Sequence, residues 1–552
     1  MKLTRLLSVV ALAGLIVSSA AAQTSDSSIA VEGGKISGAP SDVAGVAVYK
    51  AVPFAAPPVG ANRWKAPQPV LPWSGVKDSS AWPNRCYQLA SANPPGTFYF
   101  NEYYWDPSKD PKDSEDCLYL NIWVPAKPAG ASLPVMVYYH GGGNRHGNNS
   151  EVEFNAAKLA AKGIIVVSAA YRLNIMGFLA LPGMKEEGAG SFAILDAVEA
   201  LKWVKKNIGA FGGDPGKVTI AGQSAGSRNV RSVLSTPLAK GLFQRAIMHS
   251  SPTVMAQPGK PNYVTLADKM AAAGPVFEKS FPGKTLDDLR TLPVEEFYKD
   301  PAKIDAMYGV TSNMYAAIDG HVLTEDSVDL LKEGALNGVD VIVGTVADER
   351  TALDGAPDKV MDIPAFHAYW KKLLGEELYA KYSFEKLYPA STERDAYRQH
   401  LKAQADLLLE QNRIAGTLLT ARNPASKVYV YYFDHPTPGR DREYYGAWHS
   451  SDLWYTFNSL RNELGQRQWT PSDFELAERA SSMWANFVKT GDPNGDGLPI
   501  WPRASRSNKG TYLSFAETST SATSASPYLG TSAERRNALF HAYEMTFYGV
   551  SE

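Results

Sequence analysis

The sequence has little net charge and no long internal apolar run. Its 55 basic and 57 acidic residues leave a formal net charge of −2 over 552 residues. Because nucleic-acid-binding proteins carry a basic face, this balance argues against a nucleic-acid partner. Beyond the first residues, no apolar stretch reaches the ~20 residues that a membrane-spanning helix needs. The composition is otherwise ordinary for a globular protein, and it gives no indication of the oligomeric state.

Residues 1–22 differ from the rest of the chain. Lys2 and Arg5 precede a short apolar run, and three alanines follow that run. This order is the pattern of a cleavable export signal, with cleavage expected before Gln23. An N-terminal membrane anchor is the less favoured interpretation, because the apolar run is shorter than a membrane span. We therefore expect a mature chain of residues 23–552 that is secreted or periplasmic and has no stable membrane anchor.

Cysteine is also scarce, since only Cys86 and Cys117 occur. Their wide spacing excludes a C-x-x-C redox motif and the paired cysteines of a zinc site. An even number of cysteines in an oxidising compartment favours one disulfide that closes a loop of about thirty residues. Two buried free thiols are the alternative.

Six short, almost continuously apolar runs predict the strands of a parallel sheet. Strands that are covered on both faces have this character, whereas strands with one solvated face alternate between apolar and polar residues. Between the second and third runs, apolar residues recur at three- and four-residue spacing over 194–208, which predicts an amphipathic helix. The six runs are residues 133–143, 162–172, 217–222, 243–250, 339–345 and 428–435.

The remaining segments complete an α/β architecture. Three early segments, 28–38, 45–54 and 118–125, alternate or run apolar between turn residues, as antiparallel strands do. Segments 254–335 and 350–425 are expected to be helix-rich insertions. We therefore predict a mostly parallel sheet with helices on both faces and an antiparallel N-terminal extension. No Ser/Gly-rich linker interrupts residues 23–552, so one large domain is expected.

The stretch Gly222-Gln223-Ser224-Ala225-Gly226 follows a predicted strand directly. In a G-x-S-x-G nucleophile elbow, the serine occupies a strained strand-to-helix turn, and only small neighbours let the backbone pass close by. Upstream, the His140–Gly143 stretch also follows a strand and has backbone N–H groups that can stabilise an oxyanion, together with the N–H of Ala225. The pattern predicts a serine nucleophile at Ser224.

A serine hydrolase of this kind needs an acid and a histidine further along the chain. Glu349 lies just beyond the predicted strand 339–345, and His449 lies beyond the predicted strand 428–435. Asp348, next to Glu349, is the alternative acid. The order serine, acid, histidine fits a base that takes the serine proton and an acid that orients the base.

These motifs belong to a longer set that resembles the type-B carboxylesterase family, which includes cholinesterases and bacterial para-nitrobenzyl esterases. The shared stretches are VPFAAPPVGANRWKAP, SEDCLYLNIWVP, HGGG, NIGAFGGDPGKVTIAGQSAGS, DER, GAWHSSDLWYTF and KTGDPNGDGLPIWP. They cover most of the mature chain. The resemblance implies an α/β-hydrolase fold and hydrolysis of a small-molecule carboxylic ester through an acyl-enzyme.

The resemblance also implies roles for individual residues. It implies a catalytic triad of Ser224, Glu349 and His449, an oxyanion hole from Gly142, Gly143 and Ala225, and a disulfide between Cys86 and Cys117. The mechanism needs no metal and no organic cofactor. Hydrolysis of an amide, carbamate or lactone by the same triad is an alternative activity. A non-catalytic binding protein of this fold is disfavoured, because the serine, the acid and the histidine are all retained.

Several residues depart from the family pattern. Gln223 precedes the serine where the family most often has Glu, and Arg350 replaces the Gly of the usual DEG. Arg145 stands in the loop after the glycines, and Arg228 lies in the first turns of the helix after Ser224, where cations are disfavoured unless an anion compensates them. Asp or Glu from the insertions, or simple exposure, can supply that compensation. The alternative hypothesis is that Arg145 and Arg228 bind a polar or carboxylate-bearing ester.

Two further stretches carry weaker signals. Residues 98–105 are rich in aromatics inside the expected disulfide loop, where they can pack the loop onto the body, which we favour, or line the mouth of a substrate gorge. Residues 492–497 match the first half of a calcium-binding loop, but Arg503 occupies the twelfth position, where a bidentate carboxylate is needed. We expect a turn there and no metal site.

Overall fold

The computed structural model describes most of the mature chain. The expected signal peptide of residues 1–22 lies outside the described residues, as do Tyr104 and Trp105. The described residues are 28–88, 97–103, 111–126, 130–250, 263–300, 302, 306, 315–327, 329–330, 339–354, 357–439, 441–461, 467–505, 507–508, 511–516 and 531–548.

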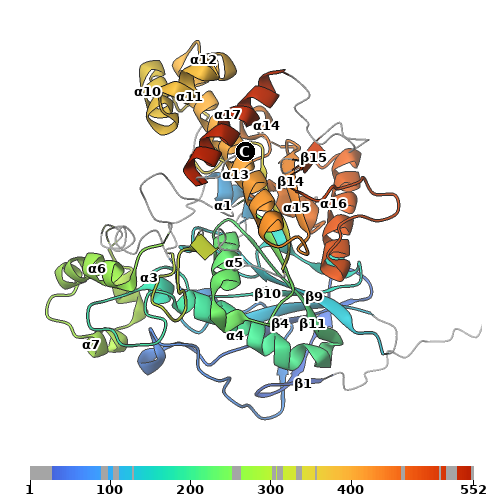
Figure 1. The fold of residues 1–552 in the computed structure, drawn as a ribbon. Helices are drawn as coiled ribbons and strands as arrows, with labels where there is room; N and C mark the ends of the chain where they lie inside the picture. Colours follow the sequence, from blue (N-terminus) through green and yellow to red (C-terminus); the bar gives the residue numbers. More distant parts are fainter. Residues whose placement is uncertain are drawn as a thin grey trace, which may run out of the picture.

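A ten-stranded sheet forms the centre of the molecule (Figure 1), with the strand order β15-β14-β13-β12-β11-β9-β10-β8-β4-β3. Neighbouring strands from β15 to β10 are parallel, whereas β8, β4 and β3 continue the sheet in antiparallel fashion. This arrangement confirms the predicted fold class. The strands are β3 (Ala39–Pro40), β4 (Val46–Pro53), β8 (Tyr119–Pro125), β9 (Leu133–Tyr139), β10 (Ile165–Ala169), β11 (Gly213–Gln223), β12 (Arg245–His249), β13 (Asp340–Val346), β14 (Val428–Asp434) and β15 (Tyr512–Ala516).

All six predicted apolar runs form strands of this sheet, but two features differ from the sequence prediction. Strand β15 was not predicted, because its five residues precede a Ser/Thr-rich stretch and give little pattern. The first alternating segment forms the hairpin of β1 (Ile29–Val31) and β2 (Gly34–Ser37), which pairs with β5 (Val76–Asp78) in a separate small sheet. These short strands are mostly half-buried, so a small sheet satisfies their pattern. A further pair joins β6 (Arg85–Cys86) to β7 (Asp113–Ser114).

Helices cover both faces of the sheet. Helices α4, α5 and α13 pack on strands β9 to β14, and α2 and α16 pack together on the other side of the sheet. The predicted amphipathic helix is α4, and α13 and α16 each begin with a capping box. The helices are α1 (Phe98–Tyr103), α2 (Ala157–Ala160), α3 (Asn174–Phe178), α4 (Phe192–Asn207), α5 (Ala225–Ser235), α6 (Leu266–Ser280), α7 (Leu286–Thr291), α10 (Ile363–Leu374), α11 (Glu376–Lys381), α12 (Phe384–Leu387), α13 (Glu393–Arg422), α14 (Arg442–Tyr445), α15 (Ser451–Thr456), α16 (Pro471–Thr490) and α17 (Thr531–Tyr548).

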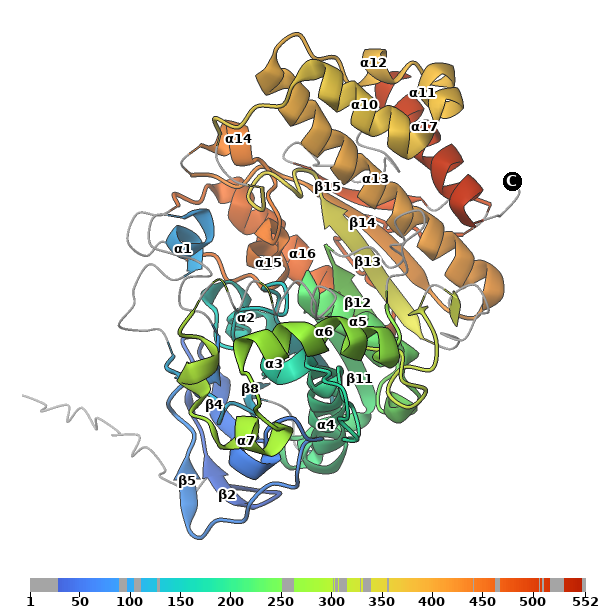
Figure 2. The ribbon, with the colours of Figure 1, turned by 90° about the vertical axis from the view of Figure 1, so that its left-hand side faces the viewer.

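A second hydrophobic cluster lies apart from the main core. It joins α10, α11, α12 and α17 to the first half of α13, and Figure 2 shows these helices gathered at one end of the molecule. Trp370 and Phe384 stack at its centre, with ring centroids 5.4 Å apart. The segments that build this cluster come from the predicted helix-rich insertion and from the C-terminal end of the chain. These helices therefore pack beside the sheet and add no strand to it.

Cys86 and Cys117 form a disulfide across a sequence separation of 31. In the chain-entropy model, a loop of this length contributes about 3–4 kcal/mol to stability. We expect the double variant Cys86→Ala/Cys117→Ala to lose that amount in urea unfolding. A reducing agent should destabilise the wild type by a similar amount and leave the variant unchanged. Equal stability of the wild type and the variant under oxidising conditions would contradict the expectation.

Candidate active site

Ser224 lies in a strained turn between β11 and α5. Its backbone has φ 55° and ψ −119°, a left-handed conformation that L-residues other than glycine seldom adopt. The Ser224 N–H donates to the carbonyl of His249, 2.9 Å away at the end of β12. The turn therefore holds the serine at the carboxyl edge of the sheet, the edge where ligands bind in open α/β folds.

The two glycines of the motif are required by close backbone approach. A Cβ on Gly226 would lie 2.0 Å from the Tyr139 carbonyl oxygen of β9. A Cβ on Gly222 would lie 2.5 Å from the Gly226 carbonyl carbon. Larger residues at either position would push α5 away from the ends of β9 and β11.

His449 and Glu349 meet at the same edge of the sheet. The imidazole Nδ1 contacts Glu349 Oε2, and both side chains are buried. Glu349 Oε1 accepts hydrogen bonds from the Thr345 hydroxyl and, at 3.1 Å, from the Val346 N–H. Burial alone would raise the pKa of Glu349, but the adjacent His449 and these hydrogen bonds hold that pKa below its ordinary value. The carboxylate is thus kept ionised beside the imidazole.

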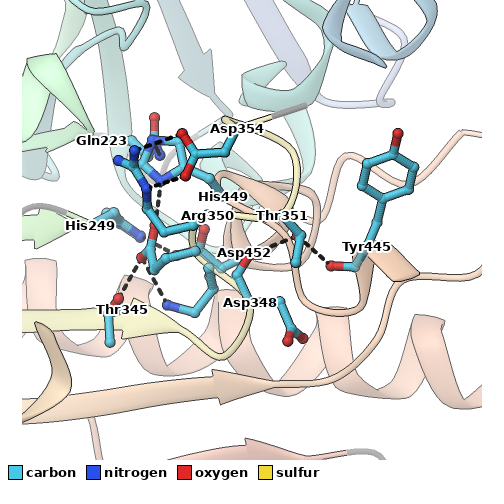
Figure 3. Close-up of polar contacts among 12 residues, drawn as sticks. Gln223, His249, Thr345, Asp348, Arg350, Thr351, Asp354, Tyr445, His449 and Asp452 are labelled. Atoms are coloured by element: carbon cyan, nitrogen blue, oxygen red, sulfur yellow. Dashed lines mark hydrogen bonds and ion pairs between the residues drawn. The ribbon is translucent and has the colours of Figure 1, made fainter. Parts of the chain in front are cut away.

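Asp348 points away from His449 and instead contacts the loop that carries it (Figure 3). Its carboxylate accepts a 2.9 Å hydrogen bond from the Ala447 N–H. The Thr351 hydroxyl oxygen lies 2.8 Å from the carbonyl oxygens of both Asp348 and Tyr445, and its single proton, shared between them, ties the two loops together. Burial raises the pKa of Asp348 to about 6. Of the two adjacent acids, Glu349 is therefore the one in contact with the histidine.

Gln223 occupies the other side of the imidazole. Its side-chain Nε2 lies 3.1 Å from His449 Nε2 (Figure 3). Because His449 Nδ1 faces a carboxylate, Nε2 carries the lone pair and accepts from the amide. In the described part of the chain, the Ser224 hydroxyl makes no hydrogen bond to the histidine. Catalytic hydrogen bonds of this kind often tighten only when substrate is bound.

Gly141, Gly142 and Gly143 form a loop after β9, here called the glycine loop, that faces the serine. Gly142 and Gly143 have φ of 95° and 68°, and Ala225 is the first residue of α5. No residue in the described ranges accepts a hydrogen bond from the N–H groups of these three residues. A Cβ on Gly142 would lie 2.0 Å from the His146 carbonyl oxygen, so this position also requires glycine. The arrangement leaves three donors for an anionic oxygen.

An amide pair that the sequence analysis did not find fixes this loop to α5. Asn144 Oδ1 accepts from Asn229 Nδ2 at 2.9 Å, and Asn144 Nδ2 donates to Asn229 Oδ1 at 3.2 Å. The Asn174 N–H also donates to the Asn144 carbonyl at 2.7 Å. The glycine amides are thereby held in a fixed position relative to Ser224.

A buried polar network behind the serine was also missed. His249, whose carbonyl holds the Ser224 N–H, contacts Asp452 Oδ2 through Nδ1 at 2.8 Å. The Tyr431 hydroxyl donates to the same carboxylate at 2.7 Å, and the Trp484 indole donates to His249 Nε2 at 3.1 Å. These four residues come from four separate elements, β12, β14, α15 and α16, so no spacing in the sequence reveals the network.

A cavity of about 660 Å³ opens over Ser224, a size that suits a small-molecule ligand. Ser224, Glu349, His449 and the glycine loop line its floor. Side chains of the second hydrophobic cluster and of α1 line its walls, and the Tyr99 hydroxyl donates to the His449 carbonyl at 3.1 Å. The wall residues are Tyr99, Tyr103, Tyr369, Trp370, Leu373, Gln404, Leu407, Leu408, Gln411 and Tyr543.

The aromatic residues of α1 both pack and line the cavity. Phe98 packs against Trp448 and Tyr445, with ring centroids 4.9 and 4.2 Å apart. Tyr99 and Tyr103 contribute to the cavity wall. The helix therefore packs onto the loop that carries the histidine, and the two roles considered for this segment are combined.

The two candidate substrate-binding arginines differ in position. Arg228 lines the cavity and is half-buried. Arg145 is exposed on the glycine loop and does not belong to the cavity lining.

The described residues contain no cluster of three or more His, Cys, Asp or Glu side chains that could hold a metal ion. None of the described helices is both long enough and apolar enough to cross a membrane. The segment 492–497 forms a turn in which Asp492 accepts from the Asn494 N–H at 2.9 Å.

The fold and the serine at its carboxyl edge define an α/β hydrolase. The model of the carboxylesterase family matches residues 25–529, and the chain therefore belongs to that family. The chain is 33% identical over 494 residues to the para-nitrobenzyl esterase of Bacillus subtilis (strain 168), covering 88% of this chain and 94% of the relative. It is 30% identical over 518 residues to the fumonisin B1 esterase of Sphingopyxis macrogoltabida, covering 90% and 88%.

Solved structures agree with this assignment. A thermophilic PNB esterase superimposes with a TM-score of 0.71 at 30% identity, covering 89% of this chain and 96% of that structure. A second PNB esterase gives a TM-score of 0.68 with the same identity and coverage. The protein is a carboxylic-ester hydrolase.

Proposed function

We propose that this protein is a secreted or periplasmic serine esterase that works through an acyl-enzyme. In this proposal, Ser224 is the nucleophile, His449 the general base and Glu349 the acid that orients the base. The observation that carries the proposal is the contact between His449 and Glu349 at the sheet edge where Ser224 occupies its strained turn. The predicted export signal and the disulfide support a location outside the cytoplasm.

The reaction begins when Ser224 Oγ attacks the ester carbonyl carbon and His449 Nε2 takes the serine proton. The carbonyl oxygen becomes an oxyanion, which accepts hydrogen bonds from the amides of Gly142, Gly143 and Ala225. The intermediate then expels the alcohol, which receives the proton from His449. A water molecule repeats these steps on the acyl-enzyme and releases the acid. Glu349 stabilises the imidazolium that forms in each half of the cycle.

Gln223 has to give up its contact with His449 Nε2 during the first step. The amide and the serine hydroxyl compete for the same lone pair, since a neutral imidazole has only one acceptor nitrogen. The amide therefore holds the ring in place before the substrate binds. It adds no charge to the site, in contrast to the Glu that the family most often has here.

Ester hydrolysis is favoured over the alternative activities by the names of the relatives, which are esterases. Amide, carbamate or lactone hydrolysis by the same triad is the second candidate. A non-catalytic role is disfavoured, because the described residues include the serine, a histidine–carboxylate pair and the free glycine amides together.

A fluorophosphonate probe tests the proposal directly. The wild type should be labelled, and Ser224→Ala should not be labelled at all. Values of kcat/KM on matched ester and amide substrates then separate the two hydrolytic candidates. Labelling that survives in Ser224→Ala would move the nucleophile elsewhere and sink the proposal.

Gln223→Glu should shift the pH dependence of activity. A carboxylate about 3 Å from the imidazole favours the protonated ring, so a larger fraction of the imidazole is protonated and unable to act as a base at any given pH. We expect the acid limb of the kcat/KM profile to move up by about one pH unit or more. Gln223→Met, which removes the amide without adding charge, is the control and should not shift the limb upward. Identical profiles for the Glu variant and the wild type would contradict the contact.

A further inference from the structure

The cavity contains a guanidinium group that forms no ion pair with any described carboxylate. Of the described residues, two arginines line the cavity, Arg228 and Arg350. Arg350 forms an ion pair with Asp354, in which Nη2 lies 2.7 Å from Oδ1. Within the described ranges, Arg228 forms no ion pair with an Asp or Glu, although its side chain is half-buried. A partly desolvated charge without a counter-charge costs free energy, so this position favours an anion from outside the protein.

The guanidinium of Arg228 is held in one orientation. Its Nη1 donates to the Tyr315 hydroxyl at 2.6 Å, and its central carbon lies 4.7 Å from the centroid of the same ring. The Nε atom is buried and has no hydrogen-bond partner in the described structure. A guanidinium can bind a carboxylate through two parallel hydrogen bonds. Because Nε is enclosed by the protein, a carboxylate in the cavity would be bound through the terminal nitrogens, of which Nη2 has no acceptor among the described residues.

Arg228 lies one helical turn beyond the serine. Its N–H donates to the Ser224 carbonyl at 3.1 Å, and one turn of helix rises ~5.4 Å. The same end of α5 carries the positive end of the helix dipole, which adds to the positive potential. Arg231, one turn further along, is buried and donates from Nε to the Tyr263 hydroxyl at 3.3 Å. An anionic group held by Arg228 would therefore lie near the reacting carbonyl.

No acid of the described cavity lining forms an ion pair with Arg228. Glu349 is in contact with His449. Glu151 and Glu153 also line the cavity, and burial together with the neighbouring Glu151 raises the pKa of Glu153 well above its ordinary range. The structure thus excludes the simplest compensation considered from the sequence, an Asp or Glu of the described insertions paired with Arg228.

We propose that Arg228 binds a carboxylate carried by the substrate, so that the enzyme prefers esters of acidic compounds to neutral esters of the same length. This inference rests on the proposed serine esterase function and adds the substrate class to it. Arg145 is not part of the proposed subsite, because its side chain is exposed and lies outside the cavity lining.

The test compares charged and neutral esters of equal length. Monomethyl esters of succinic, glutaric and adipic acid are paired with methyl butyrate, methyl pentanoate and methyl hexanoate, and kcat/KM is measured by titration of the released acid. Acetate esters of hydroxy acids, paired with neutral alkyl acetates, place the carboxylate on the alcohol side. At least one charged ester should be preferred over its neutral partner. In Arg228→Met, the ratio of charged to neutral kcat/KM should fall roughly ten- to a hundredfold.

Three measurements make the test specific. Arg228→Lys, which keeps the charge but loses the planar fork, should retain part of the preference. Arg145→Met is the matched control and should keep the wild-type ratio. Free glutarate or adipate should inhibit the wild type competitively on a neutral ester, with an inhibition constant that rises in Arg228→Met and at high salt.

The outcomes separate this inference from the proposed function. If wild type and Arg228→Met show the same ratio for every pair, the carboxylate subsite is wrong, whereas the esterase mechanism stands as long as Ser224→Ala is inactive. Equal losses on charged and neutral esters in Arg228→Met would assign Arg228 a structural role and also overturn the inference. Activity that persists in Ser224→Ala would overturn the proposed function itself.

Discussion

Ser224→Ala should lower kcat for ester hydrolysis by roughly 10⁵- to 10⁶-fold, the loss typical of removing a triad nucleophile. The remaining groups can still bind the ester and stabilise an oxyanion, but no covalent intermediate forms. The variant should fold as the wild type does. In the described structure, the Ser224 hydroxyl makes no hydrogen bond, and the bond that holds the turn comes from its backbone N–H to His249. Its thermal midpoint should therefore stay close to that of the wild type.

The matched control is a serine that lies nearby but outside the turn between β11 and α5. Ser250 follows β12 and also lines the cavity. Ser250→Ala should stay labelled by a fluorophosphonate, because its hydroxyl lies outside the turn between β11 and α5. The Ser250 side chain helps to lower the pKa of Glu349, so the variant should lose some activity, but far less than Ser224→Ala. A Ser250→Ala variant as inactive as Ser224→Ala would show that position in the cavity, and not the elbow, determines the loss.

The sheet was predictable from the sequence because its strands are buried on both faces. Runs such as 133–143 and 162–172 are apolar almost throughout, and they form the neighbouring parallel strands β9 and β10. The turn at Ser224 was predictable because the backbone approaches so closely at Gly222 and Gly226 that only glycine fits there. The loops carrying Glu349 and His449 follow strands that end at the same edge. A short motif that follows a predicted strand can therefore be placed at the edge of the sheet from the sequence alone.

The parts that the sequence did not reveal depend on pairs of residues far apart in the chain. The contact between Asn144 and Asn229 joins a loop to a helix 85 positions away, and either residue alone reads as an ordinary polar residue. The wall of the cavity combines α10, α13 and α17, so no single segment shows its shape. The sequence also left open which of Asp348 and Glu349 orients the histidine, because both carboxylates follow the same predicted strand. Only the positions of His449 and Ala447 separate them.

Glu349→Gln should reduce kcat by about 10⁴-fold while the fold is kept. A glutamine cannot stabilise the imidazolium, and its amide can donate to Nδ1, which favours the tautomer whose Nε2 carries a proton and cannot act as base. Asp348→Asn is the matched control, since it changes the adjacent acid by the same single atom. An asparagine can still accept the Ala447 N–H through its side-chain oxygen. Its activity should remain within about tenfold of the wild type, as expected for a residue outside the triad.

The same control makes a prediction about stability. Because the pKa of Asp348 is raised to about 6 in the folded protein, the protonated carboxyl stabilises the fold at low pH. This contribution is fully present below the pKa that Asp348 has in the unfolded chain, and it is lost as pH rises through 6. Asp348→Asn lacks that loss, so between pH 4 and pH 7 its stability relative to the wild type should improve by about 2–3 kcal/mol, measured by urea unfolding.

If Asp348→Asn instead lost activity 10⁴-fold and Glu349→Gln did not, Asp348 would be the acid of the triad. The contact between Glu349 and His449 would then be incidental to catalysis.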